Sequence, residues 1–276
     1  MARQTGASLR QICSVLQLPR STYYQPVATD PDQQIRPLIG EIFQANRRCY
    51  GYRRIACELA RRGVCHGQQK IRRIMRQQGL QALQRKRFTP RTSDGRASNP
   101  CANLLFKAAP PTAPNQVWAG DITYIETARG WLYLAVVIDL CSRRIIGWSV
   151  APTMQSSLVI DALGQAVQTR KSTSVTIFHS DRGSQYSSGA FREMIGKAGL
   201  QQSMSRLGNP YDNAWTESFM GTLKAEMSRE GLFTDLADAR IKLFSYIDGF
   251  YNQRRLHSSI GYVSPKQFEE KFSETK

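Results

Sequence analysis

The sequence lacks several features that would place a protein in other classes. It has no run of 18 apolar residues, so no segment has the length and composition of a membrane-spanning helix. Its first ten residues lack the apolar core of a secretory signal, and we expect a cytoplasmic protein. The six cysteines include no C-x2-C pair, and only His66 lies near three of them. This argues against zinc, and we expect reduced, mostly buried thiols.

Negative charge is also scarce, and its scarcity is uneven. The chain has 38 Lys and Arg against 21 Asp and Glu, a net charge of +17. Residues 1–100 hold 19 basic and 5 acidic residues, or +14, whereas the other 176 residues hold only +3. Such segregation predicts that the N-terminal part meets a polyanion, DNA or RNA. With 276 residues, of which 41% are hydrophobic, we expect two folded domains.

The basic N-terminal part is predicted to form short helices. Residues 1–30 are predicted to form a short helical segment, in which Tyr23 and Tyr24 suit DNA contacts or packing equally. Apolar residues recur at helical spacing over 33–46, 51–62 and 67–79, which predicts a helix-turn-helix-like domain over 31–83. A basic, solvated surface without a partner is the alternative. The candidate DNA contacts here are Arg53, Arg54, Arg72 and Arg73.

A proline-rich linker over 84–115, suited to lie along a phosphate backbone, leads into a β-rich pattern. Strands are predicted at 116–127, 131–140, 144–152, 174–181 and 200–204, with helices at 156–169, 189–198 and about 213–229. This order predicts an α/β, RNase H-like mixed sheet over 116–230. A C-terminal helical extension over 231–276 follows, with a helix from about 235 to 253 and a last segment at 265–272.

Three carboxylates stand out. Asp121 lies mid-strand, where a buried charge needs a partner or a cation, and Asp181 directly follows a strand. Glu217 shares a helical face with Asn213 and Lys224, and a solvated charge pair is the plain alternative there. Converging carboxylates repel one another, and hard divalent cations relieve that repulsion. Two such ions suit phosphoryl transfer. Glycoside hydrolysis also uses paired carboxylates, but the basic N-terminal part argues against a sugar.

The spacing and four motifs resemble a known family. Asp181 and Glu217 have 35 residues between them, and Lys224 follows Glu217 by seven, which resembles the D,D(35)E pattern of retroviral integrases and their bacterial relatives. PNQVWAGDITYI, HSDRGSQYSS, SRLGNPYDNAWTESFMGTLKAE and YNQRRLHSSIGYVSPKQFE resemble the second-reading-frame (OrfB-type) product of insertion sequences of the third type. RRCYGYRRI and IRRIMRQQGL resemble the helix-turn-helix segment before that core. The resemblance covers roughly residues 45 to 272.

The resemblance implies a DNA transposase or integrase with an RNase H-like core. By resemblance, Asp121, Asp181 and Glu217 are catalytic and bind two Mg²⁺ ions, for which Mn²⁺ can substitute. Lys224 then contacts DNA near the scissile phosphate. Asn209, Asp212 and Asn213 match positions beside the site, with Asn209 and Asn213 taken as DNA contacts. Arg254 and His257 match a motif whose role is structural or DNA-contacting.

The family chemistry is metal-dependent 3′-end cleavage followed by strand transfer. The implied partners are insertion-sequence ends, target DNA, further copies of the chain and a first-reading-frame partner or fusion. No heptad run precedes the core, and no zinc module like that of retroviral integrases is present. Two alternatives remain open: a DNA-binding regulator with an idle core, and a nuclease that only hydrolyses.

Overall fold

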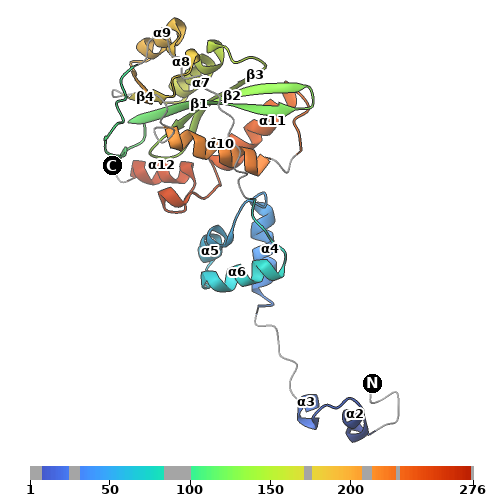
Figure 1. Ribbon diagram of the computed structural model, residues 1–276. Helices are drawn as coiled ribbons and strands as arrows, with labels where there is room; N and C mark the ends of the chain where they lie inside the picture. Colours follow the sequence, from blue (N-terminus) through green and yellow to red (C-terminus); the bar gives the residue numbers. More distant parts are fainter. Residues whose placement is uncertain are drawn as a thin grey trace.

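The computed structural model describes residues 8–24, 32–83, 101–170, 176–206, 213–227 and 231–274 (Figure 1). Asn209 and Asp212, which sequence reasoning placed beside the site, lie outside these residues. No helix in the described ranges is long and apolar enough to cross a membrane.

The first described part is a pair of short helices, α2 (Leu9–Val15) and α3 (Arg20–Tyr24). Ser8 caps α2: its hydroxyl accepts from the Gln11 amide at 3.4 Å, and the Gln11 side chain accepts from the Ser8 amide at 2.9 Å. Tyr23 and Tyr24 are exposed and stack edge to face, with ring centroids 5.3 Å apart. They are therefore not core residues of the described structure.

The second part is a bundle of three helices, α4 (Ile35–Ala45), α5 (Tyr52–Arg61) and α6 (Gln68–Gln77). The predicted helical spacing is confirmed, because its apolar residues are the ones that become fully buried. Gly63 and Gly79 follow α5 and α6 with φ of +78° and +65°, the left-handed conformation that ends helices and favours glycine. The fully buried side chains of the bundle include Ile39, Ile42, Ile55, Leu59, Ile71 and Ile74.

The thiols differ from expectation. All six cysteines are free, but only Cys13 and Cys49 are buried, whereas Cys65 is exposed. The prediction of mostly buried thiols was wrong because the cysteines after Cys49 fall on helix flanks and connections rather than on the apolar stripes.

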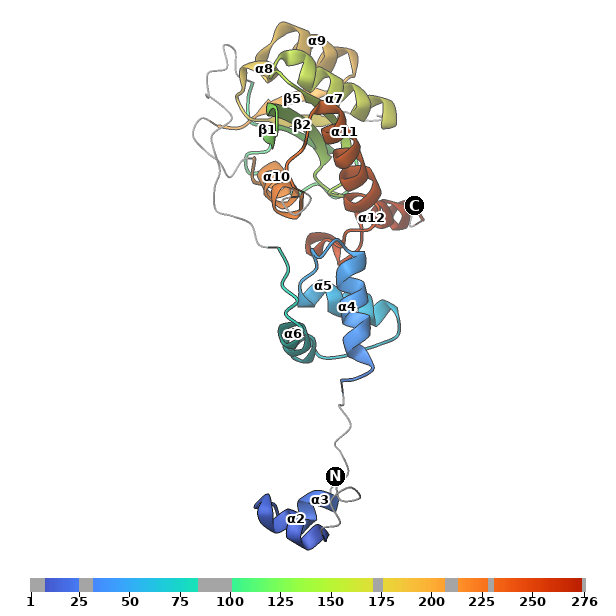
Figure 2. The ribbon, with the colours of Figure 1, turned by 90° about the vertical axis from the view of Figure 1, so that its right-hand side faces the viewer.

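The bundle packs against the C-terminal segment of the chain (Figure 2). The Tyr50 hydroxyl donates to the Arg254 carbonyl at 3.1 Å and accepts from the Leu256 amide at 2.9 Å. Arg54 Nε donates to the Leu256 carbonyl at 2.8 Å. Residues some 200 positions apart thus fix the bundle to the core.

The third part contains a five-stranded sheet in the order β3-β2-β1-β4-β5. Its strands are β1 (Val117–Thr127), β2 (Gly130–Asp139), β3 (Ile145–Ala151), β4 (Ile177–Ser180) and β5 (Gln201–Met204). β1, β2 and β3 pair antiparallel, whereas β4 and β5 run parallel to β1. The predicted mixed sheet is confirmed.

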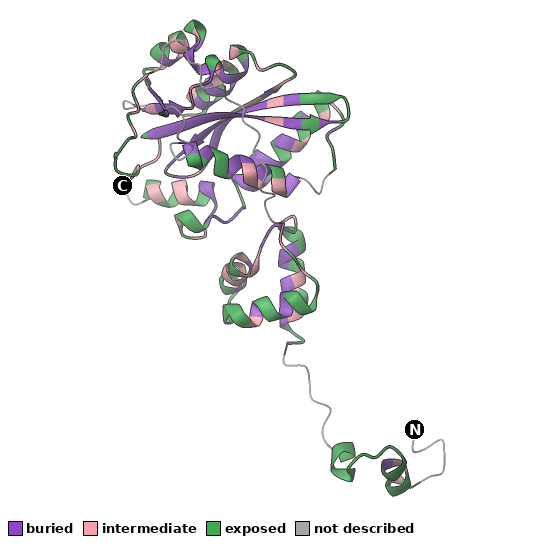
Figure 3. Cartoon of the chain, viewed as in Figure 1, coloured by how far each residue is buried: buried purple, intermediate pink, exposed green. Residues whose placement is uncertain are grey.

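Helices cover both faces of this sheet, and the strands between them are buried (Figure 3). The apolar residues of α7 (Ser156–Thr169), α8 (Ser184–Ser187) and α9 (Gly189–Lys197) form one core with one sheet face. α10 (Ala214–Met227) and α11 (Leu236–Phe244) share the other core. Sequence reasoning missed the short α8, which lies directly after Asp181.

The single helix predicted over 235–253 is interrupted. α11 continues as a π-helical segment, η3 (Ser245–Tyr251), followed by a 3₁₀ turn, η4 (Ser258–Ile260), and α12 (Pro265–Glu274). Tyr246, Ile247, Phe250 and Tyr251 are buried along this π segment.

The C-terminal half of the predicted linker is not a free tether. The Met204 amide donates to the Ala102 carbonyl at 3.3 Å, and Ser203 Oγ accepts from the Leu104 amide at 2.9 Å. The Asn115 amide donates to Asp139 Oδ2 at 2.6 Å. Residues 101–115 therefore run along the β5 edge and the core, because polar groups there form hydrogen bonds with the backbone of this segment.

Candidate active site

Two neighbouring strands and one helix carry the three predicted carboxylates. Asp121 lies in the middle of β1 and is only 8% exposed. Asp181 directly follows β4, the parallel neighbour of β1. Glu217 lies in the first turn of α10, which packs on β1. The topology thus brings all three to one end of the β1–β4 pair.

The negative charges of the other two carboxylates act on Asp121. Burial raises its pKa well above the ordinary value, and the negative charge of Asp181 and then of Glu217 raises it further. The Ile122 amide, which donates to Asp121 Oδ1 at 2.9 Å, and the Thr216 side chain act in the opposite direction. The structure therefore concentrates negative charge here, which is the electrostatic setting of a cation site.

The carboxylates share a region without forming a finished coordination shell. No three His, Cys, Asp or Glu side chains of the described ranges stand close enough to hold one metal ion. Asp181 Oδ1 instead accepts from the Gly183 amide at 3.0 Å. Desolvation raises the pKa of Glu217, whose side chain remains exposed. The donor chemistry, three hard oxygen ligands with mutual repulsion, fits a divalent cation.

A buried ionic cluster holds the far end of α10. Arg255 contacts Glu226 with its Nη2 2.6 Å from Oε1 and its Nε 3.0 Å from both carboxylate oxygens, and the Tyr246 hydroxyl donates to Glu226 Oε2 at 2.8 Å. Arg255 and Glu226 side chains are each 6% exposed. Burial lowers the pKa of Arg255, but the negative charge of Glu226 has the larger effect, and the net pKa is raised. This cluster fixes the helix that carries Glu217.

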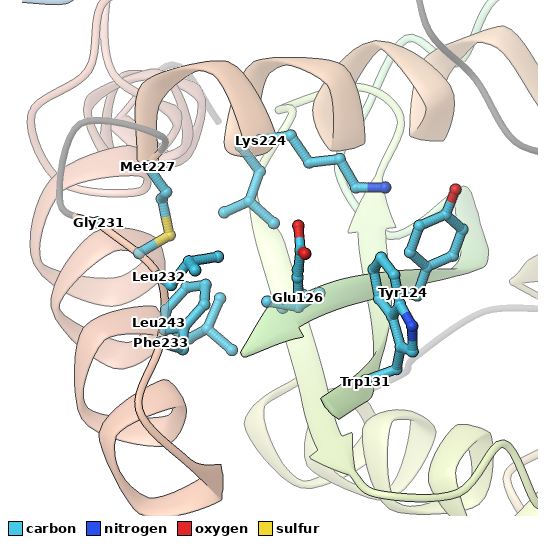
Figure 4. Close-up of a pocket in the computed structure, with 11 residues that line it drawn as sticks. Tyr124, Glu126, Trp131, Lys224, Met227, Gly231, Leu232, Phe233 and Leu243 are labelled. Carbon is cyan, nitrogen blue, oxygen red and sulfur yellow. The ribbon is translucent and has the colours of Figure 1, made fainter. Parts of the chain in front are cut away.

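Lys224 lies one to two helical turns beyond Glu217, and its ammonium reaches over Tyr124 (Figure 4). Nζ stands 4.2 Å from the centroid of that ring, which in turn contacts Trp131 edge to face at 5.0 Å. Loss of water lowers the pKa of Lys224, and the charge of Asp121 partly offsets this. An apolar cavity of about 340 Å³ lies beside these residues, with Glu126 at its wall. Lys224 forms no ion pair within the described ranges.

The other predicted DNA contacts have varied surroundings. Asn213 is 6% exposed and so does not face solvent in the described structure. Arg53 and Arg72 are exposed and lie 5.5 and 5.9 Å from the Tyr52 ring centroid. Arg73, also exposed, pairs with Asp32 at 2.6 Å. Arg54 is partly buried, and its Nε donates to the Leu256 carbonyl at 2.8 Å.

Sequence reasoning assigned no role to Tyr186, although it lies in a quoted motif. Its side chain is 2% exposed, and its hydroxyl has no hydrogen-bond partner among the described residues. Burial, Asp121 and Asp181 all raise its pKa well above the ordinary value. The ring packs beside Gly120, where an added Cβ would lie 3.3 Å from Tyr186 Cε1 and 2.5 Å from Phe178 Cζ. Such contacts leave no sequence signal beyond a glycine preceding Asp121.

Comparison with known proteins identifies the family. The integrase core domain family matches residues 111–210, a second integrase core domain family matches residues 198–265, and the HTH-like domain family matches residues 30–88. The chain is 38% identical over 276 residues to the transposase InsF for insertion sequence IS3A of Escherichia coli, covering 97% of this chain and 96% of that protein. The chain belongs to the insertion-sequence transposase family.

Other members of the insertion-sequence transposase family align over most of their length. The transposase for insertion sequence element IS904 of Lactococcus lactis is 41% identical over 232 residues, covering 84% of this chain and 91% of that protein. The insertion element IS600 uncharacterized 31 kDa protein of Shigella sonnei is 37% identical over 267 residues, covering 95% and 98%. The alignments therefore span both the helical bundle and the sheet domain.

Solved integrase structures are also similar to this family member. A chain of the simian T-cell lymphotropic virus intasome matches with a TM-score of 0.48 at 18% identity, covering 78% of this chain and 70% of that chain. The HTLV-2 integrase catalytic core domain in complex with magnesium matches with a TM-score of 0.43 at 19% identity, covering 57% and 98%.

Proposed function

We propose that this chain is a metal-dependent DNA strand transferase that cleaves the 3′ end of insertion-sequence DNA and joins it to target DNA. The observation that carries the proposal is the buried Asp121 carboxylate on β1, whose pKa is raised by burial and by Asp181 and Glu217. A buried carboxylate beside two others is costly to ionise without a cation, which supports a metal site at this position. Membership of the transposase family supplies the substrate class.

Asp121, Asp181 and Glu217 would hold two divalent ions, Mg²⁺ or Mn²⁺. Such ions supply activation of an attacking oxygen and stabilisation of a leaving one in an in-line phosphoryl displacement. β1 and β4 would hold two of the carboxylates on neighbouring strands, and α10, which the Arg255–Glu226 ion pair fixes, would carry the third. Water would first attack the phosphodiester at the end of the element and break its P–O3′ bond, leaving a free 3′-OH on the element and a 5′-phosphate on the flanking strand. That 3′-OH would then attack a target phosphodiester, form the new P–O bond and displace a 3′-OH of the target strand.

Lys224 would position the DNA next to this site. Its ammonium is held over Tyr124 and has no ion-pair partner in the described part of the chain, so it is available to a phosphate. Asn213 is assigned to the same interface, and the exposed Arg53, Arg72 and Arg73 give the helical bundle a phosphate-binding surface. Two DNA ends and a target require more than one copy, and a first-reading-frame partner or fusion completes the proposed assembly.

The test is strand joining. A labelled, pre-cleaved end oligonucleotide is incubated with plasmid and Mg²⁺ or Mn²⁺, using the wild type, Asp181→Asn and Glu217→Gln. Joining by the wild type alone is expected. Asp161→Asn and Glu193→Gln are matched controls, because they make the same changes at exposed helix positions. Strand joining by Asp181→Asn would contradict the proposal. The proposal would also be contradicted if the wild-type chain bound DNA but joined no strands, both alone and when fused to the first-frame segment.

A second readout does not depend on turnover. Mn²⁺ should raise the melting temperature of the wild type, because it relieves the repulsion at Asp121, and Asp121→Asn should abolish most of that increase. Products longer than the substrate separate a strand transferase from a nuclease that only hydrolyses. Turnover of any kind excludes the regulator with an idle core.

A further inference from the structure

A second cavity, of about 280 Å³, lies where three separate parts of the chain meet. α5 contributes Arg54, the turn between β2 and β3 contributes Arg143, and the C-terminal segment contributes His257. α10 forms one wall with Trp215, Ser218 and Thr222, and Ser258 and Ser259 lie at the opening. This cavity contains none of the three predicted catalytic carboxylates.

Positive charge in this cavity exceeds negative charge. The Arg143 guanidinium carbon stands 4.1 Å from the Trp215 ring centroid, and Arg143 Nε is buried without a hydrogen-bond partner in the described ranges. Neither Arg143 nor Arg54 forms an ion pair there, whereas Arg255, at the cavity wall, is neutralised by Glu226. Burial lowers the pKa of both Arg143 and Arg54. Partly buried cations without a counterion are costly, so the arrangement favours an anion.

A histidine adds an unsatisfied group to the same cavity. His257 is 8% exposed, and its Nε2 is buried without a partner among described residues. Burial, followed by Arg255, Arg54 and Arg143, keeps its pKa well below the ordinary value, so the ring is neutral. An anion placed among these cations would offset their effect and favour the imidazolium form, in which both ring nitrogens donate. The serine hydroxyls at the opening are further donors of the kind that phosphates use.

We propose that this cavity binds a backbone phosphate of DNA, at a position other than the scissile phosphate. The inference rests on the proposed function in one respect, that the polyanion is DNA. Because Arg54, Arg143 and His257 come from the bundle, the sheet domain and the C-terminal segment, one phosphate would connect all three. DNA binding would thereby reinforce the attachment of the bundle to the part of the chain that contains α10, the helix that carries Glu217.

Salt-dependent binding tests this assignment without catalysis. Anisotropy of a labelled 30-base-pair duplex is measured in EDTA over a range of salt concentrations. Loss of one phosphate contact lowers the slope of log K against log salt by about 0.9, which is about an eightfold weaker binding at 0.1 M salt. Arg143→Gln should show this loss, and Arg143→Lys should retain the slope. Arg129→Gln is the matched control, since Arg129 is 74% exposed and distant in sequence from the cavity residues.

A second variant guards against misfolding. Ser259 is exposed, so Ser259→Asp introduces a competing negative charge at the cavity opening without removing a buried group. It should weaken duplex binding to a similar extent, with an unchanged circular dichroism spectrum. Unchanged slopes in both Arg143→Gln and Ser259→Asp overturn the proposal.

Inorganic phosphate distinguishes a free anion from DNA. Melting temperatures are compared in phosphate and chloride at equal ionic strength. Stabilisation of the wild type by phosphate, lost in Arg143→Gln and accompanied by the slope change, supports the DNA site. Phosphate stabilisation without a slope change assigns the cavity to a free anion and overturns the DNA assignment. Because binding is measured in EDTA, failure of strand joining would refute the proposed function while leaving this result standing.

Discussion

Removing Arg255 should destabilise the protein far more than removing any surface arginine. Arg255→Met removes the cation that neutralises Glu226 and leaves that carboxylate with neutral partners such as the Tyr246 hydroxyl. Both charged side chains are 6% exposed, so water cannot replace the lost partner without rearrangement. Breaking a buried pair on one side typically costs about 3–5 kcal/mol. For a domain of this size, that corresponds to a melting temperature lower by roughly 10 °C.

The same reasoning makes a contrasting prediction for removal of both charges. Glu226→Leu combined with Arg255→Met leaves no buried ion, and only the Tyr246 hydroxyl loses its acceptor. Replacement of a buried pair by apolar groups is often close to neutral, so the double variant should lie within about 2 kcal/mol of the wild type. Glu193→Gln breaks an exposed pair with Lys197, 65% and 72% exposed, and should leave stability almost unchanged.

The measurement is urea unfolding followed by circular dichroism for all four proteins. A double variant as unstable as Arg255→Met alone would refute the reasoning, because the cost would then come from lost packing rather than from an unpaired charge. A destabilisation of Arg255→Met no larger than that of Glu193→Gln would refute it in a second way, by showing that the pair is effectively solvated.

Three further predictions test other parts of the structure. Gly120→Ala places a Cβ 2.5 Å from Phe178 Cζ and should cost about 1–3 kcal/mol in thermal melts, whereas Gly196→Ala, with open space on a helix, should cost nothing. Burial raises the pKa of Glu269, but its ion pairs with Arg170 and Arg144 outweigh burial, and the pKa in the folded protein is lowered. The stabilisation from Glu269 should therefore be complete above its unfolded pKa and be lost as the pH falls through its folded pKa. Glu269→Gln should accordingly be less stable than the wild type by about 1.5–3 kcal/mol at pH 7 and as stable as the wild type at strongly acidic pH. Lys224→Ala should reduce strand joining at least tenfold while leaving the melting temperature within about 2 °C, and Lys224→Arg should keep most of the activity; a joining rate equal to wild type in Lys224→Ala would contradict its assignment.

The sheet and its flanking helices could be predicted from the sequence because local patterns determine them. Apolar alternation and runs mark β1, β2 and β3, and α7 begins and ends at the predicted residues, 156 and 169. Asp121 and Asp181 were candidate site residues because one lies within a strand and the other directly follows one, whereas Glu217 was a candidate through its helical face and its spacing from Asp181. Their assignment as metal ligands remains a prediction.

What could not be predicted depends on contacts between distant segments. The buried residues of the π-helical segment have the spacing of a regular helical face, so no local pattern indicated the wider turn. The position of residues 101–115 is set by hydrogen bonds to β5 and to Asp139, across 24 to about 100 residues of sequence. Tyr186 and the Arg143 cavity likewise depend on which side chains the fold brings together.

The buried ionic cluster of Glu226 and Arg255 at the end of α10 has a consequence for the order in which the chain is made. Its acceptor, Glu226, is made some thirty residues before its donor, Arg255, and the three carboxylates all precede both. A nascent chain emerging from the ribosome therefore carries every predicted catalytic residue before it carries the side chain that fixes the helix holding the last one. The helix that carries Glu217 is therefore fixed by this ion pair only after the C-terminal segment has been made.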